Sequence, residues 1–165
     1  MNLRQQIEVA FAHRQSPVCV VEFAGEPTPE QNDALWFTRK DWHHLNRQDW
    51  ERHPDAIYAF TPEAFLYYVP SILTVTLESN GQWLQVADSL IGFLNRTPTV
   101  EYWDSFFCER FVGLSNPEYE ALQAWLLSLS GNGVAWCEDA LSRAYETVDL
   151  LKRETERLQR FVNAR

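Results

Sequence analysis

The chain has 165 residues, a formal net charge of −9 and a sequence pI near 4.9. This length suits a single domain that buries its own core, and the hydrophobic content of 45% excludes a disordered chain. The acidic charge disfavours nucleic acid as a partner, because proteins bind its phosphates through basic side chains. Residues 1–137 contain 17 acidic and 8 basic residues, so they carry the whole net charge.

The cysteines and the N-terminal residues indicate a soluble cytoplasmic protein. Cys19, Cys108 and Cys137 are odd in number and form no CxxC pair, which disfavours a disulfide framework or a structural zinc site. The first residues, MNLRQQIEVAFAHR, lack the apolar segment of a secretory signal, and no run approaches the roughly 18 apolar residues that a membrane helix needs. We expect no membrane partner and no cofactor, since no cofactor motif is present.

The N-terminal part predicts a helix, an extended segment and a loop. Apolar residues recur at helical spacing between Leu3 and Arg14, which indicates an amphipathic helix. Residues 18–23, VCVVEF, are short and β-branched but have no partner strand. We expect them to form an extended segment on a helical body, with at most a minor β element. Residues 25–33, GEPTPEQND, are typical of a loop.

Residues 59–79 predict a buried central helix. Thr61 suits the N-cap, Pro62 the first helical position and Glu63 the first turn. The residues that follow are apolar on nearly every side, so neighbouring elements are expected to pack around this helix. Pro70 lies inside the pattern and predicts a kink or a break there.

The second half of the chain predicts four further helices. Asn116 is the predicted N-cap of the third helix, which begins at that residue. The last has a heptad pattern from Leu141 to Val162. This apolar stripe either packs along the body of the protein or forms a homodimer, and packing is the favoured alternative. The elements together predict a mainly α-helical, single-domain bundle around a buried, Pro-kinked central helix. Apolar stripes place the second-half helices over residues 83–94, 102–111, 116–129 and 134–162.

The densest set of ligand-type side chains lies in residues 41–55. His43, His44 and His53 lie there among aspartates, and imidazole and carboxylate groups bind divalent metals. Adjacent histidines point apart in most backbone conformations, however, and no HExxH or HxH motif is present. Solvated or hydrogen-bonded histidines in a turn region are the favoured interpretation, and a metal site is the alternative.

Glu101 precedes an aromatic segment, YWDSFF, and Asp104 lies within it. Paired carboxylates beside aromatic rings occur in glycoside hydrolases. Acidic residues are also favoured in the first turn of a helix, where they face the positive end of its dipole, and we prefer this interpretation. Cys108 lies among phenylalanines and is interpreted as a small buried hydrophobe. The sequence indicates no catalytic residue.

Trp36, Trp42 and Trp50 lie in a charged region with weak periodicity. Exposed tryptophans are frequent anchors of protein interfaces, whereas buried ones fill gaps between helices, and the gap-filling role is slightly favoured. If they are exposed, these tryptophans are candidates for a partner-binding surface, together with Glu101 and Asp104. An acidic surface with aromatic anchors suits a basic protein partner.

Two motifs resemble an uncharacterised bacterial family, a domain of unknown function. The resemblance covers roughly residues 1–130, and the amphipathic segment 134–163 looks like an addition to that body. The resemblance implies a small, mainly helical bacterial protein and supplies no catalytic residues. The first motif, TPEAF-x-YYxP, is formed by residues 61–70, and the second, RF-x-L-[ST], by Arg110, Phe111, Leu114 and Ser115.

The leading functional hypothesis is a non-catalytic protein-binding module. Within this class we expect an immunity-type protein that neutralises a toxin-like, basic partner, because the chain is small and acidic and has no catalytic motif. The enzyme alternative is a metal-dependent hydrolase that uses His43, His44 or His53. The structural alternative is a homodimer through Leu141–Val162.

Overall fold

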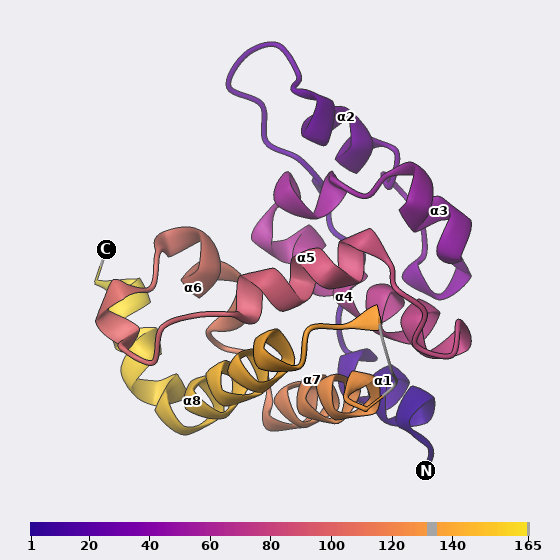
Figure 1. Ribbon diagram of the computed structural model, residues 1–165. Coiled ribbons are helices and arrows are strands. Elements are labelled where there is room, and N and C mark those ends of the chain that lie inside the picture. The colour runs from indigo at the N-terminus through magenta and orange to yellow at the C-terminus, as the bar shows by residue number, and fades with distance from the viewer. Residues whose placement is uncertain (132–134, 165) are drawn as a thin grey trace. The chain divides into compact units, whose positions relative to one another are not determined.

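The computed structural model of the chain describes residues 1–131 and 135–164 (Figure 1). Within these ranges the regular secondary structure is helical and no strand is present, which confirms a mainly α-helical fold. The helices group into two compact units. One unit contains residues 1–10 and 91–165, and the other contains residues 11–90.

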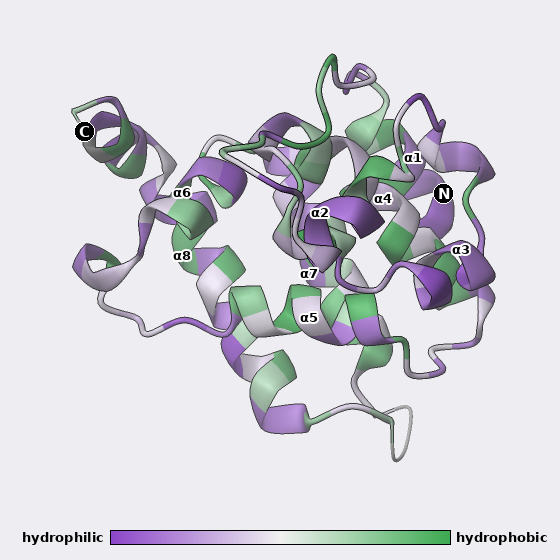
Figure 2. Cartoon of the chain, turned by 90° about the horizontal axis from the view of Figure 1, so that it is seen from above, coloured by the Kyte–Doolittle hydropathy of each residue, from purple (hydrophilic) through white to green (hydrophobic). Residues whose placement is uncertain are grey.

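The unit of residues 11–90 is built from short helices and one long one. Helix α5 includes the boundary between the units, which lies between Leu90 and Ile91. Helix α2 is mostly hydrophilic (purple in Figure 2), as its sequence PEQNDAL requires. The elements are α2 (Pro29–Leu35), η1 (Trp42–His44), α3 (Arg47–Arg52), η2 (Ala56–Tyr58), α4 (Pro62–Glu78) and α5 (Gln85–Leu94).

Helix α4 is the predicted buried helix. The hydroxyl of Thr61 accepts a hydrogen bond from the backbone N–H of Ala64, and Pro62 follows the cap. All but one of the residues from Ala64 to Thr76 are buried. Pro70 lies inside α4, and the helix continues beyond it to Glu78, so the chain does not break there. Contacts on all sides hold the two halves of the helix in one element despite the missing N–H of proline.

Aromatic rings from several elements form a cluster that packs against α4 and includes its Tyr68. The ring of Phe37 lies 4.6 Å from that of Trp50 and 5.3 Å from those of Phe60 and Tyr68. The polar ends of these rings are also satisfied. The indole N–H of Trp50 donates to the hydroxyl of Ser71 at 2.9 Å, and the Tyr68 hydroxyl donates to the carbonyl of Phe37 at 2.6 Å. Buried Trp and Tyr side chains need such partners.

The segment 18–23 is not a strand, and its backbone bends at Val18 and Val20. It is attached to the start of α4 by two hydrogen bonds from Thr61. The backbone N–H of Thr61 donates to Val20 O, and the Thr61 hydroxyl donates to Cys19 O, both at 2.9 Å. Val20 and Val21 are buried. The segment therefore lies on a helical body without a partner strand, as expected, but it is bent and not continuously extended.

The other unit contains a buried stripe along its longest helix. Cap geometry differs from the sequence prediction at one point, because the N-cap of α7 is Ser115 and not Asn116. Ser115 and Glu118 form a reciprocal capping box, which satisfies two backbone N–H groups at once. The elements are α1 (Leu3–Phe11), η3 (Val100–Tyr102), α6 (Ser105–Phe111), α7 (Asn116–Leu129) and α8 (Glu138–Asn163).

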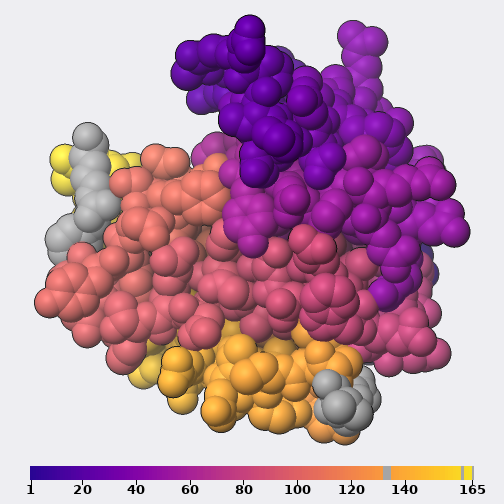
Figure 3. All heavy atoms as spheres, turned by 45° about the horizontal axis from the view of Figure 1, so that its top comes forward, coloured from indigo at the N-terminus to yellow at the C-terminus, as the bar shows by residue number. Residues whose placement is uncertain are grey.

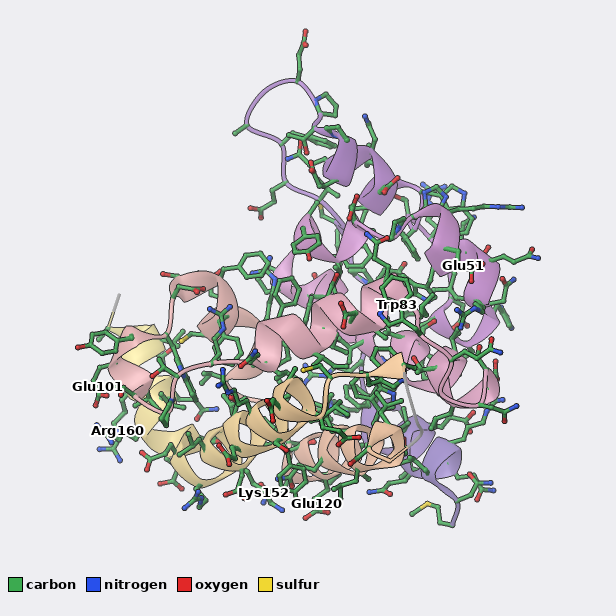
Figure 4. All side chains as sticks on the ribbon, in the orientation of Figure 1. Glu51, Trp83, Glu101, Glu120, Lys152 and Arg160 are labelled. Atoms are coloured by element: carbon green, nitrogen blue, oxygen red, sulfur yellow. The ribbon has the colours of Figure 1, made fainter. Side chains whose placement is uncertain are left out.

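Helix α8 packs on α7 and α6 and lies beside α7 in Figure 1. Ion pairs at 2.9 Å join Lys152 to Glu120 of α7 and Arg157 to Glu101 of η3, and Figure 4 shows Lys152 beside Glu120. Helix α8 therefore packs along its own unit, which is the alternative that the sequence favoured. A homodimer through Leu141–Val162 would need the same apolar face of α8. The expected first residue, Val134, lies outside the described residues. The buried stripe of α8 consists of Leu141, Ala144, Val148, Leu151 and Leu158.

None of the described helices combines the length and the apolar composition that a membrane span requires.

Replacement of Leu151 by Ala tests the packing of α8. Leu151 is fully buried, so Leu151→Ala should lower the free energy of unfolding by about 2–5 kcal/mol, measured by urea denaturation. Leu150 is its half-buried neighbour, and Leu150→Ala should cost clearly less. Equal costs for the two variants would show that α8 does not pack by this face.

The Tyr68 hydroxyl should make stability depend on alkaline pH. Burial raises the pKa of Tyr68 above its ordinary value, so the folded protein resists ionisation there. Tyr68 in the unfolded chain ionises near pH 10, so its contribution is complete below that pH and is lost as the pH rises further. Tyr68→Phe should therefore cost about 1–3 kcal/mol at pH 8, and the difference from wild type should shrink above about pH 10. A constant difference up to pH 11 would contradict this.

Candidate functional site

The structure buries two of the three tryptophans that the sequence offered as anchors. Trp42 is 3% exposed and Trp50 is 0% exposed, so exposure of these two is wrong and the gap-filling interpretation holds for them. Trp36 is half-buried. Its ring stacks on the imidazole of His53 at 4.6 Å, and the ammonium of Lys40 lies 4.3 Å from the ring centroid. Little of its apolar surface is left for a partner.

Glu101 and Asp104 belong to the other unit and have structural partners there. Glu101 lies in η3 and accepts a hydrogen bond from Arg157 at 2.9 Å. Asp104 is the N-cap of α6 and accepts from the backbone N–H of Phe107 and from Arg96, both at 2.8 Å. The preferred interpretation of Asp104 as an acid at a helix start is confirmed, and the two carboxylates bind different arginines.

The histidines do not converge on one point. The Nδ1 atom of His43 lies 2.7 Å from Asp41 Oδ1, whereas that of His53 lies 3.2 Å from Asp33 Oδ1. Among the residues that the structure describes, no group of three or more His, Cys, Asp or Glu side chains is placed to hold a metal ion. Cys108 is buried, as expected, and all three cysteines are free thiols.

An exposed tryptophan that the sequence reasoning missed is Trp83, which is 48% exposed. The apolar stripe of residues 83–94 includes it, but helix α5 begins only at Gln85. Trp83 therefore lies in the turn before the helix, where Asn80 and Gly81 have positive φ angles of 55° and 70°. The helix boundary decides its exposure, and boundaries are the least certain part of a sequence prediction.

Arg47 holds this turn in place. Its guanidinium donates to the carbonyl of Trp83 and, at 3.5 Å, to that of Gln82. The Nε of Arg47 donates to Glu51 at 2.6 Å, so the positive charge is paired within α3. The side chains of Glu51 and Trp83 are labelled in Figure 4. Trp83 is thus an exposed aromatic side chain on a backbone that Arg47 holds at two adjacent carbonyl groups.

A second exposed aromatic side chain, Tyr58, is connected to the same helix. Tyr58 is 46% exposed, and its hydroxyl donates to Ser89 Oγ of α5 at 3.1 Å. Asp55, just before η2, accepts a hydrogen bond from Gln85 at 3.4 Å. Gln85 is two residues from Trp83. These bonds join η2 to the first turns of α5 and place Tyr58, Asp55 and Trp83 on neighbouring segments.

Tyr58 and Asp55 also line a surface hollow of about 530 Å³ between α2 and η2. Its rim is ordered, because Thr28 and Gln31 form a capping box and the side chain of Gln31 donates to Glu22 O at 3.2 Å. The loop and α2 lie at the surface of this unit, in dark violet in Figure 3. The residues that line the hollow are Thr28, Glu30, Gln31, Asp55, Tyr58 and Ala59.

The hollow is acidic. Glu30 and Asp55 line it, and no basic side chain is among the described lining residues. The backbone N–H of Glu30 and the Thr28 hydroxyl lower the pKa of the Glu30 carboxyl below its ordinary value. Residues 11–90 contain 11 acidic and 5 basic residues, so the unit as a whole is negative. We call the lining residues, together with Gln85 and Trp83, the acidic strip.

Comparisons of the chain with protein-family models, with curated proteins and with solved structures find no match. The candidate site therefore depends on its own geometry, and the resemblance to a bacterial family stays a prediction.

Replacement of Arg47 tests whether it fixes the Trp83 turn. Arg47→Met keeps the apolar stem and the helix propensity but removes the donors, so the free energy of unfolding should fall by about 1.5–3 kcal/mol. Amide hydrogen exchange at residues 79–84 should accelerate. Arg52→Met is the matched control, because Arg52 is exposed at the end of the same helix, and it should change neither quantity appreciably. Unchanged exchange in Arg47→Met would contradict the role.

Proposed function

We propose that the chain is a non-catalytic protein-binding module and that its acidic strip holds a basic segment of another protein. The observation that supports this most is the acid-lined hollow with the exposed Tyr58 in its lining. A second exposed aromatic side chain, Trp83, lies two residues from Gln85, which donates a hydrogen bond to Asp55 of the hollow. Charged groups of one sign in a concave site attract a partner of the opposite sign and accelerate its association.

The two aromatic side chains supply contacts that a charge alone does not. Tryptophan and tyrosine are enriched among the interface residues that contribute most to affinity. A lysine or arginine of the partner that lies over the Trp83 ring gains about 0.5–2 kcal/mol. Because Arg47 fixes the turn before binding, little conformational entropy is lost when Trp83 becomes covered.

The biological form that we favour is an immunity-type protein, which neutralises a toxin-like partner by covering its surface. The small size, the acidic charge and the resemblance to a bacterial family support this form. The alternatives have less support. A metal-dependent hydrolase needs histidines that converge, and His43 and His53 pair with different aspartates. A homodimer through Leu141–Val162 needs an apolar face that is buried within its own unit.

Charge-removing variants distinguish specific binding from general acidity. The tagged protein is used to capture partners from a lysate of the native cells at low and at high salt. We expect one stoichiometric, basic partner that is lost at high salt. Glu30→Gln with Asp55→Asn, or Trp83→Ala alone, should weaken its binding about tenfold or more. Glu109→Gln with Glu156→Gln removes the same charge from exposed positions of the other unit and should leave binding within about twofold.

Two results would count against the proposal. One is a partner that all these variants bind equally well, because the acidic strip would then not be the binding surface. The other is the absence of any partner at either salt concentration. The immunity form is tested separately: co-expression with the toxin-like partner should restore growth, and the Glu30→Gln, Asp55→Asn variant should fail to do so.

A further inference from the structure

A second hollow in the unit of residues 11–90 offers hydrogen-bond donors, whereas the hollow of the acidic strip offers acceptors. It has a volume of about 420 Å³, and its lining does not include any residue of the acidic strip. Small-molecule sites commonly have volumes of this order and a few polar groups that fix the ligand. The lining residues that matter for its chemistry are Trp36, Arg39, Lys40, Asp41, His44 and Asp49.

The two carboxylates in this hollow are already used by the chain itself. Asp41 is the N-cap of η1, and its Oδ1 accepts from the backbone N–H of His43 at 2.9 Å and lies 2.7 Å from the His43 ring. Asp49 accepts at 2.9 Å from the backbone N–H of Asn46 in a capping box. One oxygen of each carboxylate is therefore bound by a backbone N–H group of the chain itself.

The donors in the hollow remain available. Within the part of the chain that the structure describes, the side chains of Arg39 and His44 make no hydrogen bond or ion pair, and both residues are exposed. The His44 backbone N–H donates to Asp41 O at 3.1 Å, which leaves the imidazole nitrogens unused. The ammonium of Lys40 lies 4.3 Å over the Trp36 ring, and its N–H groups are not used by that contact. The stack of His53 on Trp36 at 4.6 Å occupies one face of that ring, so Lys40 lies over the other.

The backbone at Arg39 is held in an unfavourable conformation. Its φ angle is 62°, in the left-handed region that glycine or asparagine adopts more easily. The buried Tyr68 hydroxyl explains how the turn is kept, because it lies 2.6 Å from Phe37 O and 3.0 Å from Lys40 O, on either side of Arg39. The turn places a guanidinium without an ion pair at the rim of the hollow. A purely structural turn would be more stable with glycine at this position.

We propose that this hollow binds an oxyanion, a phosphate or carboxylate group of a small ligand. The planar guanidinium of Arg39 matches two oxygens of such a group, and the Lys40 ammonium and the His44 imidazole supply further donors. The long-range field of an acidic chain repels anions, so binding depends on these local donors and not on net charge. This site is independent of the acidic strip.

The test is an NMR titration of the uniformly ¹⁵N-labelled full chain at pH 7 with inorganic phosphate and, separately, with acetate, each at constant ionic strength. We expect saturable shifts confined to the amides of residues 36–49. Saturation by phosphate alone assigns a phosphate ligand, and saturation by acetate alone assigns a carboxylate ligand. The absence of saturable shifts there with both probes overturns the proposal.

Two matched variants separate the site from bulk charge. Arg39→Asn keeps a residue that tolerates the left-handed backbone, so the fold is retained, and its affinity for the anion should fall about tenfold or more. Arg52→Asn removes the same charge from an exposed position in the same unit and should change the affinity less than twofold. Equal losses in the two variants would show a general charge effect and would overturn the assignment to Arg39.

Discussion

The burial of helix α4 on nearly every side between Ala64 and Thr76 is the constraint on which the organisation of residues 11–90 depends. A helix that is apolar on nearly every side must be covered on every side, and its few polar neighbours must be hydrogen-bonded. Tyr68 and Ser71 of α4 meet this need. The Tyr68 hydroxyl donates to Phe37 O, which attaches the loop after α2 to the core. The Ser71 hydroxyl accepts from the Trp50 indole N–H, which attaches helix α3.

The surface features of this unit follow from the same attachments. The Tyr68 hydroxyl holds the turn that presents Arg39, and α3, once packed on α4, carries Arg47 to the turn that presents Trp83. Rigid elements thus position two different surfaces. One has acidic side chains around exposed aromatics, and the other has hydrogen-bond donors around a turn that is strained at Arg39.

Acidic residues in this chain have two roles that composition alone does not separate. Asp41, Asp49 and Asp104 accept hydrogen bonds from backbone N–H groups at helix starts, and this use of acids is local. Glu30 and Asp55 instead line a hollow that forms where α2 meets η2. The first role is visible in a sequence as an acid near a helix start, whereas the second needs the tertiary contact.

Local physical chemistry made much of the fold predictable. The Thr61-Pro62 start of α4, its burial and the buried stripe of α8 follow from caps and apolar periodicity, which act over a few neighbouring residues. The difference at Ser115 is a shift of one position within the same type of cap.

The tertiary structure alone decided which tryptophans are exposed and which charged groups are available. Trp50 is buried against residues far along the chain, such as Phe60 and Ser71, which accepts from its indole N–H. Trp83 is exposed in the turn before helix α5. His43 and His53 are separated because each binds a different aspartate. Contacts between residues far apart in the chain determine burial, and no pattern of near neighbours contains them.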